Sequence, residues 1–250
     1  MLAELAAAFT LLTRLPMGWL RQSHSDAAFA RAIWAYPLVG VVVGGIAAGT
    51  YAVAVGVGLP GNFAAVCALA MSALVTGGLH EDALADMADA FGGRTKERKL
   101  EIMRDSRVGS FGVLALVLSL AARWSAITAI GAPGRAANAI VVAAIVGRGA
   151  MIVPLLVLPP ARSDGLASGL SGLSKQRALI GLIFSFAVTY ILLRPPAALG
   201  VTAGAILAAC CVSALAWQQI GGQTGDVLGA TEIAVECIVL ATLTLNTLQG

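Results

Sequence analysis

The sequence contains little charge. Of its 250 residues, 12% are Asp, Glu, Lys or Arg and 58% are hydrophobic, whereas soluble domains are about half apolar and about a quarter charged. This composition excludes an ordinary soluble domain and predicts a protein of the lipid bilayer. The first twenty residues lack an early Lys or Arg, so we expect no basic region of a cleaved signal peptide.

Cysteine is also sparse. The four cysteines lie inside apolar runs and lack the spacing of metal ligands. We therefore expect packing roles for all of them: Cys67, Cys210, Cys211 and Cys237.

Long apolar runs make up most of the sequence. Crossing about 30 Å of hydrocarbon takes about 20 apolar residues, and seven runs approach this length, although the fifth is short. The predicted spans are Ala32–Leu59, Asn62–Leu79, Val108–Ile130, Ala137–Leu158, Ala178–Leu193, Ala197–Trp217 and Glu232–Leu248. The N-terminal segment, ended near Pro16, predicts an interfacial helix. We expect an all-α, polytopic membrane bundle that forms a single domain over residues 1–250.

The basic residues outside these spans are unevenly distributed. Twelve of the sixteen Lys and Arg residues fall on the side of the N-terminus, and only Arg135 and Arg194 fall on the other. This bias places the N-terminus in the cytoplasm. It also explains the net charge of +3, so we expect no nucleic-acid partner.

The stretch GGLHEDALADMADAFGG, residues 77–93, is unusually acidic. On a helix, Asp82, Asp86 and Asp89 fall within about 60° of one another, and like charges so placed repel. A divalent cation such as Mg²⁺, which prefers carboxylate oxygens with water and phosphate, would remove this repulsion. The flanking pair Gly77–Gly78 would let backbone approach a ligand closely. The alternative is a solvated acidic turn balanced by the basic residues that follow.

The next polar stretch, RTKERKLEIMRDSRVGSFG, combines acid and base. Asp105 stands beside Arg104 and Arg107, which suggests a further metal ligand with guanidinium groups that hold phosphate oxygens. A basic amphipathic helix that merely touches anionic lipid would look similar.

A third stretch, GGQTGDVLGATEIAVE, begins at Gly221 and echoes GGLHEDAL at the same spacing of Gly, Gly, Asp and Leu. The echo makes Asp226 a counterpart of Asp82, next to Gly225, although common turn chemistry would also explain it. Glu232 and Glu236 follow one helical turn apart, where carboxylates need a partner, a metal ion or a wet cavity.

Two arginines fall inside predicted spans. Arg148 is near the middle of its apolar run and needs an anionic partner, either Glu236 or a substrate phosphate. Arg123 is closer to a span end, and we expect its side chain to reach the interface.

The three polar stretches together closely resemble the motifs of cobalamin synthase, the adenosylcobinamide-GDP ribazoletransferase family, in order and spacing along most of the chain. The resemblance implies that a ribose hydroxyl of α-ribazole or its 5′-phosphate attacks the phosphorus next to the aminopropanol arm of adenosylcobinamide-GDP. GMP leaves, and Mg²⁺ is the implied cofactor. One departure from the family pattern HxDGLAD is Ala83, which stands in the place of a glycine.

The predicted roles follow from the residues and the resemblance together. The metal ligands are Asp82, Asp86, Asp89, Asp105 and Asp226, and the catalytic residues are His80, Asp82 and Asp226. The substrate-binding residues are Gly77, Gly78, Arg104, Arg107, Arg148, Gly225, Glu232 and Glu236. We expect the site on the cytoplasmic side of a bacterial inner membrane, and a homo-oligomer is left open. Alternatives are another Mg²⁺-dependent phosphotransferase or prenyltransferase of membranes, or a transporter.

Overall fold

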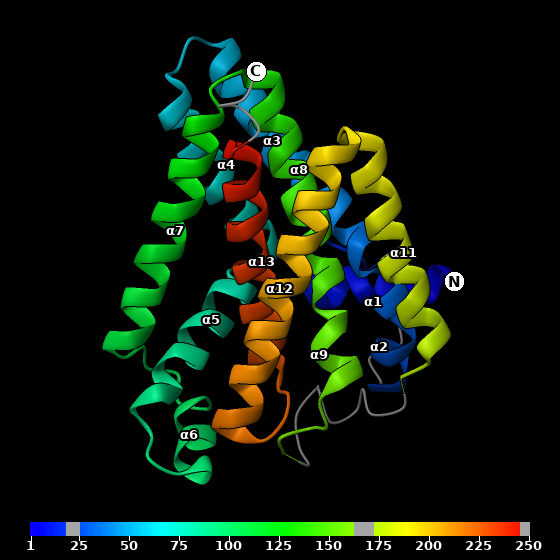
Figure 1. Cartoon of the computed structure of the whole chain (residues 1–250), viewed down its shortest axis with the longest axis vertical. Helices are drawn as coiled ribbons and strands as arrows, with labels where there is room; N and C mark the ends of the chain where they lie inside the picture. The colour runs from blue at the N-terminus through cyan, green and yellow to red at the C-terminus, as the bar shows by residue number, and fades with distance from the viewer. Residues whose placement is uncertain (19–25, 163–172, 246–250) are drawn as a thin grey trace.

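The structure is a computed structural model that describes residues 1–18, 26–162 and 173–245. These residues form helices joined by short loops (Figure 1). In the first half they are α1 (Leu2–Leu12), α2 (Asp26–Ala32), η1 (Ile33–Ala35), α3 (Tyr36–Gly56), α4 (Gly61–Thr76), α5 (Leu79–Asp89), η2 (Ala90–Gly92) and α6 (Lys96–Ile102). The second half contributes α7 (Ser110–Ile130), α8 (Pro133–Ala150), α9 (Ile152–Val157), α11 (Lys175–Leu192), α12 (Pro195–Ile220) and α13 (Gly225–Leu245).

Within the described ranges, six helical stretches are long and apolar enough to cross a membrane. A seventh crossing is broken: α4 and the α5–η2 helix pass the same test together but are bent by 88°. The chain leaves α3 at one end of the bundle and enters α7 at the other (Figure 1), so this bent pair accounts for the remaining crossing. The predicted helical membrane bundle is therefore confirmed, with one span interrupted.

The interruption is the main departure from the predicted spans. The expected helix over Asn62–Leu79 stops at Thr76, because Gly77 and Gly78 adopt left-handed φ angles of 69° and 71°. Such angles are costly for residues with a Cβ. The new helix α5 then starts in a different direction, with polar residues in its first turn.

Other boundaries shift by a few residues. α1 ends at Leu12, ahead of Pro16, where Thr13 turns to extended backbone. The last span begins at Gly225 instead of Glu232, so both glutamates lie inside the helix; its predicted end at Leu248 lies outside the described residues.

The centre of the bundle is built from α8 and α13. In these spans 72% and 67% of the most apolar stretch is buried, against 22–44% in the other four. Glycines permit close packing around them, as in other membrane bundles. A Cβ on Gly40 of α3 would lie 2.4 Å from the backbone oxygen of Ala144 in α8.

The crossing of α5 and α13 is equally tight. A Cβ on Gly229 of α13 would lie 2.5 Å from the Cβ of Ala83 in α5, closer than real Cβ atoms approach one another. The residue at which this chain departs from the family pattern therefore packs directly on a glycine of the third polar stretch.

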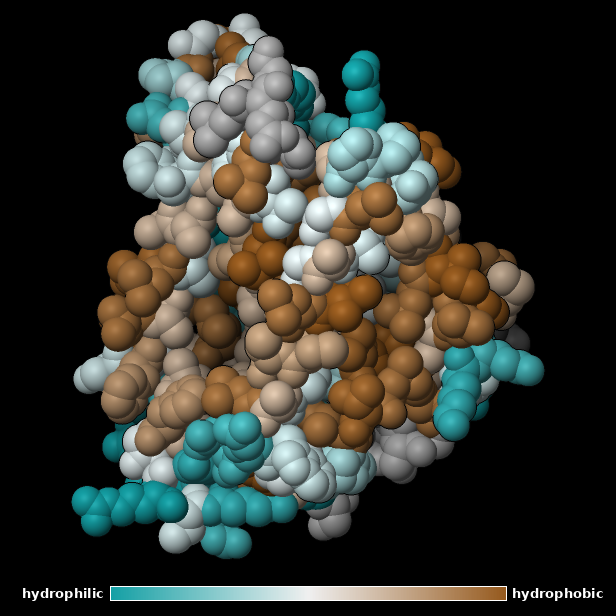
Figure 2. Space-filling view, in the orientation of Figure 1, coloured by the Kyte–Doolittle hydropathy of each residue, from teal (hydrophilic) through white to brown (hydrophobic). Residues whose placement is uncertain are grey.

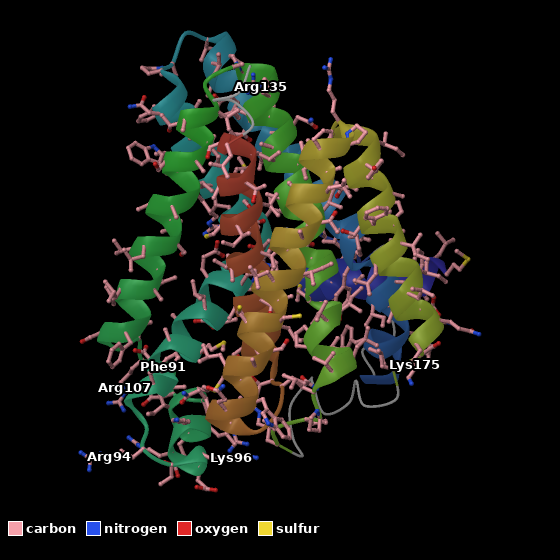
Figure 3. All side chains as sticks on the ribbon, in the orientation of Figure 1. Phe91, Arg94, Lys96, Arg107, Arg135 and Lys175 are labelled. Carbon is pink, nitrogen blue, oxygen red and sulfur yellow. The ribbon has the colours of Figure 1, made fainter. Side chains whose placement is uncertain are left out.

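The surface matches a membrane protein. Figure 2 shows hydrophobic side chains over the middle of the visible face and hydrophilic ones toward its two ends. Arg94, Lys96, Arg107 and Lys175 lie at one end of the bundle and Arg135 lies at the other (Figure 3). These labelled residues lie at opposite ends of the bundle as the sequence groups them (Figure 3), and which end faces the cytoplasm stays a prediction.

This orientation makes a testable prediction. In a protein whose four native cysteines are replaced, we expect Lys96→Cys to react with a membrane-impermeant thiol reagent only after the cytoplasmic face is opened. Arg135→Cys should react in intact spheroplasts, because basic loops stay inside. The cysteine-free protein, which should not react, is the control, and labelling of both positions from one side would contradict the topology.

Candidate active site

A network of buried charges lies at the centre of the bundle. Arg123 of α7 reaches Glu236 of α13 (Nη1 to Oε2, 3.0 Å) and Glu81 of α5 (Nη2 to Oε1, 3.1 Å). Arg148 of α8 reaches Glu232 (Nη1 to Oε1, 2.8 Å) and Glu236 (Nη1 to Oε1, 3.5 Å) of α13. The two arginine side chains are 2% and 1% exposed. The network therefore ties four helices together inside the protein.

The pairing follows from the cost of burying charge. An ion in a low-dielectric interior is stable only when it is paired and hydrogen-bonded. Two guanidinium groups face three carboxylates, and His80 adds a polar neighbour, its Nδ1 lying 3.9 Å from Oε2 of Glu232. The expectation that Arg123 reaches the interface is wrong, because its side chain is 2% exposed and pairs inside the protein with the buried Glu236 and the partly buried Glu81. For Arg148, the structure shows the ion pair that the sequence left as one of two alternatives.

A large polar cavity of about 690 Å³ opens beside this network, where α1, α4 and α5 meet. Its wall includes both left-handed glycines, Gly77 and Gly78, with Glu81 and Asp82 from the start of α5. The exposed Arg14, which follows α1, lines the same cavity. Its backbone N–H donates to the oxygen of Val75 at 2.7 Å. The cavity thus combines a guanidinium group, a carboxylate and exposed helix-end backbone.

A smaller cavity of about 250 Å³ adjoins the larger one. Three residues line both cavities: Leu11, Leu79 and Asp82. The smaller one adds His80 from α5 and Gly225 and Asp226 from the start of α13. The structure therefore places the two aspartates of the repeated GG stretches in the wall of one cavity.

The loop before α13 holds Asp226 in this position. Gly221 ends α12 with a left-handed φ of 70°, as Gly77 ends α4. Thr224 donates through Oγ1 to Oδ2 of Asp226 at 3.1 Å, and Arg162 lies 4.0 Å from the same oxygen. Arg162 is brought there because residues 159–161 pair with Gln223 through backbone hydrogen bonds of 2.8 and 2.9 Å.

The three aspartates on one face of α5 have different environments. Asp82 is exposed, Asp86 is half-buried and Asp89 is buried. Both oxygens of Asp89 accept backbone hydrogen bonds, from Gly109 (2.6 Å) and Gly112 (2.8 Å) at the start of α7. The predicted metal ligand Asp89 thus caps a neighbouring helix in this structure, as carboxylates do at helix N-termini.

The predicted residues between α6 and α7 are not part of either cavity wall. Asp105 forms an exposed pair with Arg107, with Nη2 donating to Oδ2 at 2.6 Å. The hydrogen bonds from Arg107 lower the pKa of Asp105 to about 2. Arg104 is exposed on the same loop. Metal or substrate contacts by these three residues remain predictions.

The carboxylates fit the requirements of Mg²⁺ only in part. Over the described ranges, no three His, Cys, Asp or Glu side chains converge on one point. Mg²⁺ does not need such a cage, since it is held by one or two carboxylates with water and substrate phosphates. Asp82 and Asp226 share a cavity, and Asp86 is close enough to repel both. This donor set suits a Mg²⁺ ion that arrives with a phosphate.

Three lining residues were not predicted from the sequence: Arg14, Tyr36 and Arg162. Arg14 and Arg162 are two of the twelve basic residues on the side of the N-terminus, and nothing in the local sequence marks them as site residues. Their proximity to the acidic residues depends on contacts between distant segments. Tyr36 opens an apolar span and carries no local signal of a site.

The fold and its polar interior define the class of the protein, an integral membrane bundle with a charged network and two cavities beside the break in a span. A family model described as cobalamin-5-phosphate synthase matches residues 4–244. The chain belongs to this family.

Curated relatives agree with this assignment. The chain is 43% identical over 240 residues to an adenosylcobinamide-GDP ribazoletransferase of Bradyrhizobium diazoefficiens, covering 96% of this chain and 92% of the relative. The protein of the same name from Mesorhizobium japonicum is 41% identical over 242 residues, with the same coverage. A Sinorhizobium protein of this name is 38% identical over 252 residues, covering 97% and 96%. No solved structure matches the chain significantly.

The buried network makes a prediction about stability. Replacing Arg123 by Met leaves Glu81 and Glu236 without this partner, and we expect a loss of about 3–5 kcal/mol in the free energy of unfolding. Arg98→Met removes an exposed pair with Glu101 and should cost less than about 1 kcal/mol. Unfolding of both variants by SDS in mixed micelles measures the difference. Equal stability of the two variants would show that the network does not stabilise the bundle.

Proposed function

We propose that this protein is an adenosylcobinamide-GDP ribazoletransferase, which joins α-ribazole or its 5′-phosphate to adenosylcobinamide-GDP in the late assembly of cobalamin. The observation that carries the proposal is that Asp82 lines both cavities. Two substrates could thus approach one polar centre from different sides. The names of the relatives supply the substrates.

The proposed reaction is a displacement at phosphorus. An oxygen of the ribose forms a new bond to the phosphorus that carries the aminopropanol arm. The bond from this phosphorus to the oxygen of GMP breaks, and the hydroxyl loses its proton. Because such transfers depend mainly on alignment and charge stabilisation, the protein has to position two substrates and neutralise a diphosphate.

We assign the larger cavity to the diphosphate. Arg14 provides a guanidinium group suited to phosphate oxygens, and the backbone at Gly77 and Gly78 can approach a ligand closely. Asp82 and Asp226 would hold Mg²⁺, and the nearby carboxylate of Asp86 would add negative charge that favours the cation. When bound, Mg²⁺ would offset the negative charge of the diphosphate and of the departing GMP.

The smaller cavity then receives the riboside. His80, in its wall, is our candidate to accept the proton of the attacking hydroxyl, since imidazole is the commonest general base. Glu232 lies beside the other ring nitrogen, as a positioning group would. Glu232, Glu236 and Arg148 act in this proposal through the buried network that holds α5 against α13.

The location follows from the same arrangement. We place the protein in the bacterial inner membrane with both cavities open toward the cytoplasm. Support comes from Arg94, Lys96, Arg107 and Lys175, which lie at one end of the bundle (Figure 3). The cysteine-labelling experiment on position 96 tests this placement as well.

The direct test is turnover by the purified protein in liposomes. With adenosylcobinamide-GDP, α-ribazole and Mg²⁺, we expect cobalamin and GMP in equal amounts. Excess EDTA should abolish the reaction and added Mg²⁺ should restore it, because the acidic residues otherwise repel the diphosphate. Absence of GMP release with Mg²⁺ would refute the function, and full turnover in EDTA would refute the metal requirement.

A second prediction concerns Asp82 and Asp226 as a unit. Asp82→Asn and Asp226→Asn each keep the side-chain size and remove a charge, and each should lower turnover about a hundredfold or more. Because residues that act together are non-additive, the double variant should be hardly worse than the poorer single variant. The exposed Glu101→Gln is a matched control that should keep turnover within twofold. Losses that multiply would show that the two loops act independently.

A further inference from the structure

The smaller cavity has an apolar interior and a charged rim. Leu11 and Leu12 of α1, Met151 and Leu228 line it together with the ring of Tyr36. Its charged lining residues are Asp82, Arg162 and Asp226. A ligand that fits this cavity has an apolar part and a polar part that reaches the aspartates.

Two residues that line this cavity each carry a buried polar atom without a hydrogen-bond partner among the described protein atoms. The two atoms are the hydroxyl oxygen of Tyr36 and Nε2 of His80, on residues that are 1% and 2% exposed. Buried polar groups are nearly always satisfied, and a specific exception asks for an explanation. Because both residues line the same cavity, a ligand with matching polar atoms would explain both.

The size and polarity of the cavity select among parts of the proposed substrates. Cavities for drug-sized ligands measure roughly 300–1,000 Å³, so about 250 Å³ suits a bicyclic ring and excludes a corrinoid. Guanine presents several donors and acceptors that each need a partner when buried. The 5,6-dimethylbenzimidazole base of α-ribazole presents apolar edges and a single acceptor nitrogen.

We propose that this cavity is the subsite for the base of α-ribazole and that Tyr36 is a specificity-determining residue, whose hydroxyl donates to the free ring nitrogen. The inference rests on the proposed function and adds a residue to it. With the base among Leu11, Met151 and Leu228, the ribose lies toward Asp82 and Asp226. The second unpartnered atom, Nε2 of His80, then faces the sugar.

The hydroxyl of Tyr36 serves the ligand and not the fold, which makes Tyr36→Phe a clean variant. The substitution keeps the ring and removes a group that bonds no described protein atom, so the unfolding midpoint should not fall. Tyr51→Phe is the matched control. Tyr51 lies on the same helix, is 1% exposed and belongs to an apolar cluster away from both cavities.

The first measurement is equilibrium binding of α-ribazole alone to the detergent-solubilised protein by calorimetry. Loss of one hydrogen bond to a buried acceptor should raise the Kd in Tyr36→Phe about fivefold to tenfold, with Tyr51→Phe unchanged. In turnover, the KM for α-ribazole should rise by the same factor while the KM for adenosylcobinamide-GDP stays within twofold. An unchanged Kd, or a rise in the KM for adenosylcobinamide-GDP instead, would overturn the assignment.

A substrate analogue tests the atomic contact itself. The riboside of 5,6-dimethylindole replaces the ring nitrogen by a C–H group, so the wild-type protein should bind it about fivefold to tenfold more weakly than α-ribazole. Tyr36→Phe should bind the two ribosides equally, because the group that distinguishes them is gone. If both proteins discriminate to the same degree, Tyr36 does not read this nitrogen.

The binding measurement also distinguishes failure of the subsite from failure of the proposed transferase function. Wild-type protein that binds α-ribazole with the predicted dependence on Tyr36, yet releases no GMP, would refute the transferase function and keep the subsite. Normal turnover with the same KM for α-ribazole in the wild-type protein and in Tyr36→Phe would refute the subsite and keep the transferase function.

Discussion

The structure depends on the pairing of charge inside a bilayer protein. Arg123 and Arg148 are buried where an unpaired cation would be very costly, and their partners come from α5 and α13. Satisfying both guanidinium groups fixes the rotation of four helices at once. The start of α5 is thereby held against α13, and the arrangement brings Asp82 and Asp226 to one cavity.

The broken span gives this arrangement its opening. Non-helical backbone at membrane depth is tolerated where it is buried in protein or lines a wet cavity, and the break at Gly77–Gly78 lines the larger of the two cavities. Helix ends exposed in this way form the binding sites of many membrane proteins. The interrupted helix therefore combines two tasks: it completes the bundle and presents the polar first turn of α5 to a ligand.

Local patterns in the sequence predicted much of this, and distant pairings did not. Apolar runs located the spans, and the repeated GG stretches indicated that Asp226 belongs with Asp82. The partners of Arg123, in contrast, lie 42 and 113 residues away in the chain, which no spacing rule reveals. Asp89 looked like one of three equivalent acids, because its role as a cap depends on backbone amides 20 and 23 residues later. The hydroxyl of Tyr36 stands out only in the structure, because it is buried and has no hydrogen-bond partner among the described residues.

The contact between Ala83 and Gly229 has an evolutionary consequence. The gap between α5 and α13 at this crossing holds one methyl group, and here α5 carries it. A sequence with glycine at position 83, as in the family pattern, leaves room for alanine at 229 without moving either helix. Only one of the two positions can carry a methyl group at this crossing. The residue at position 83 therefore determines which residues are tolerated at position 229, and the reverse.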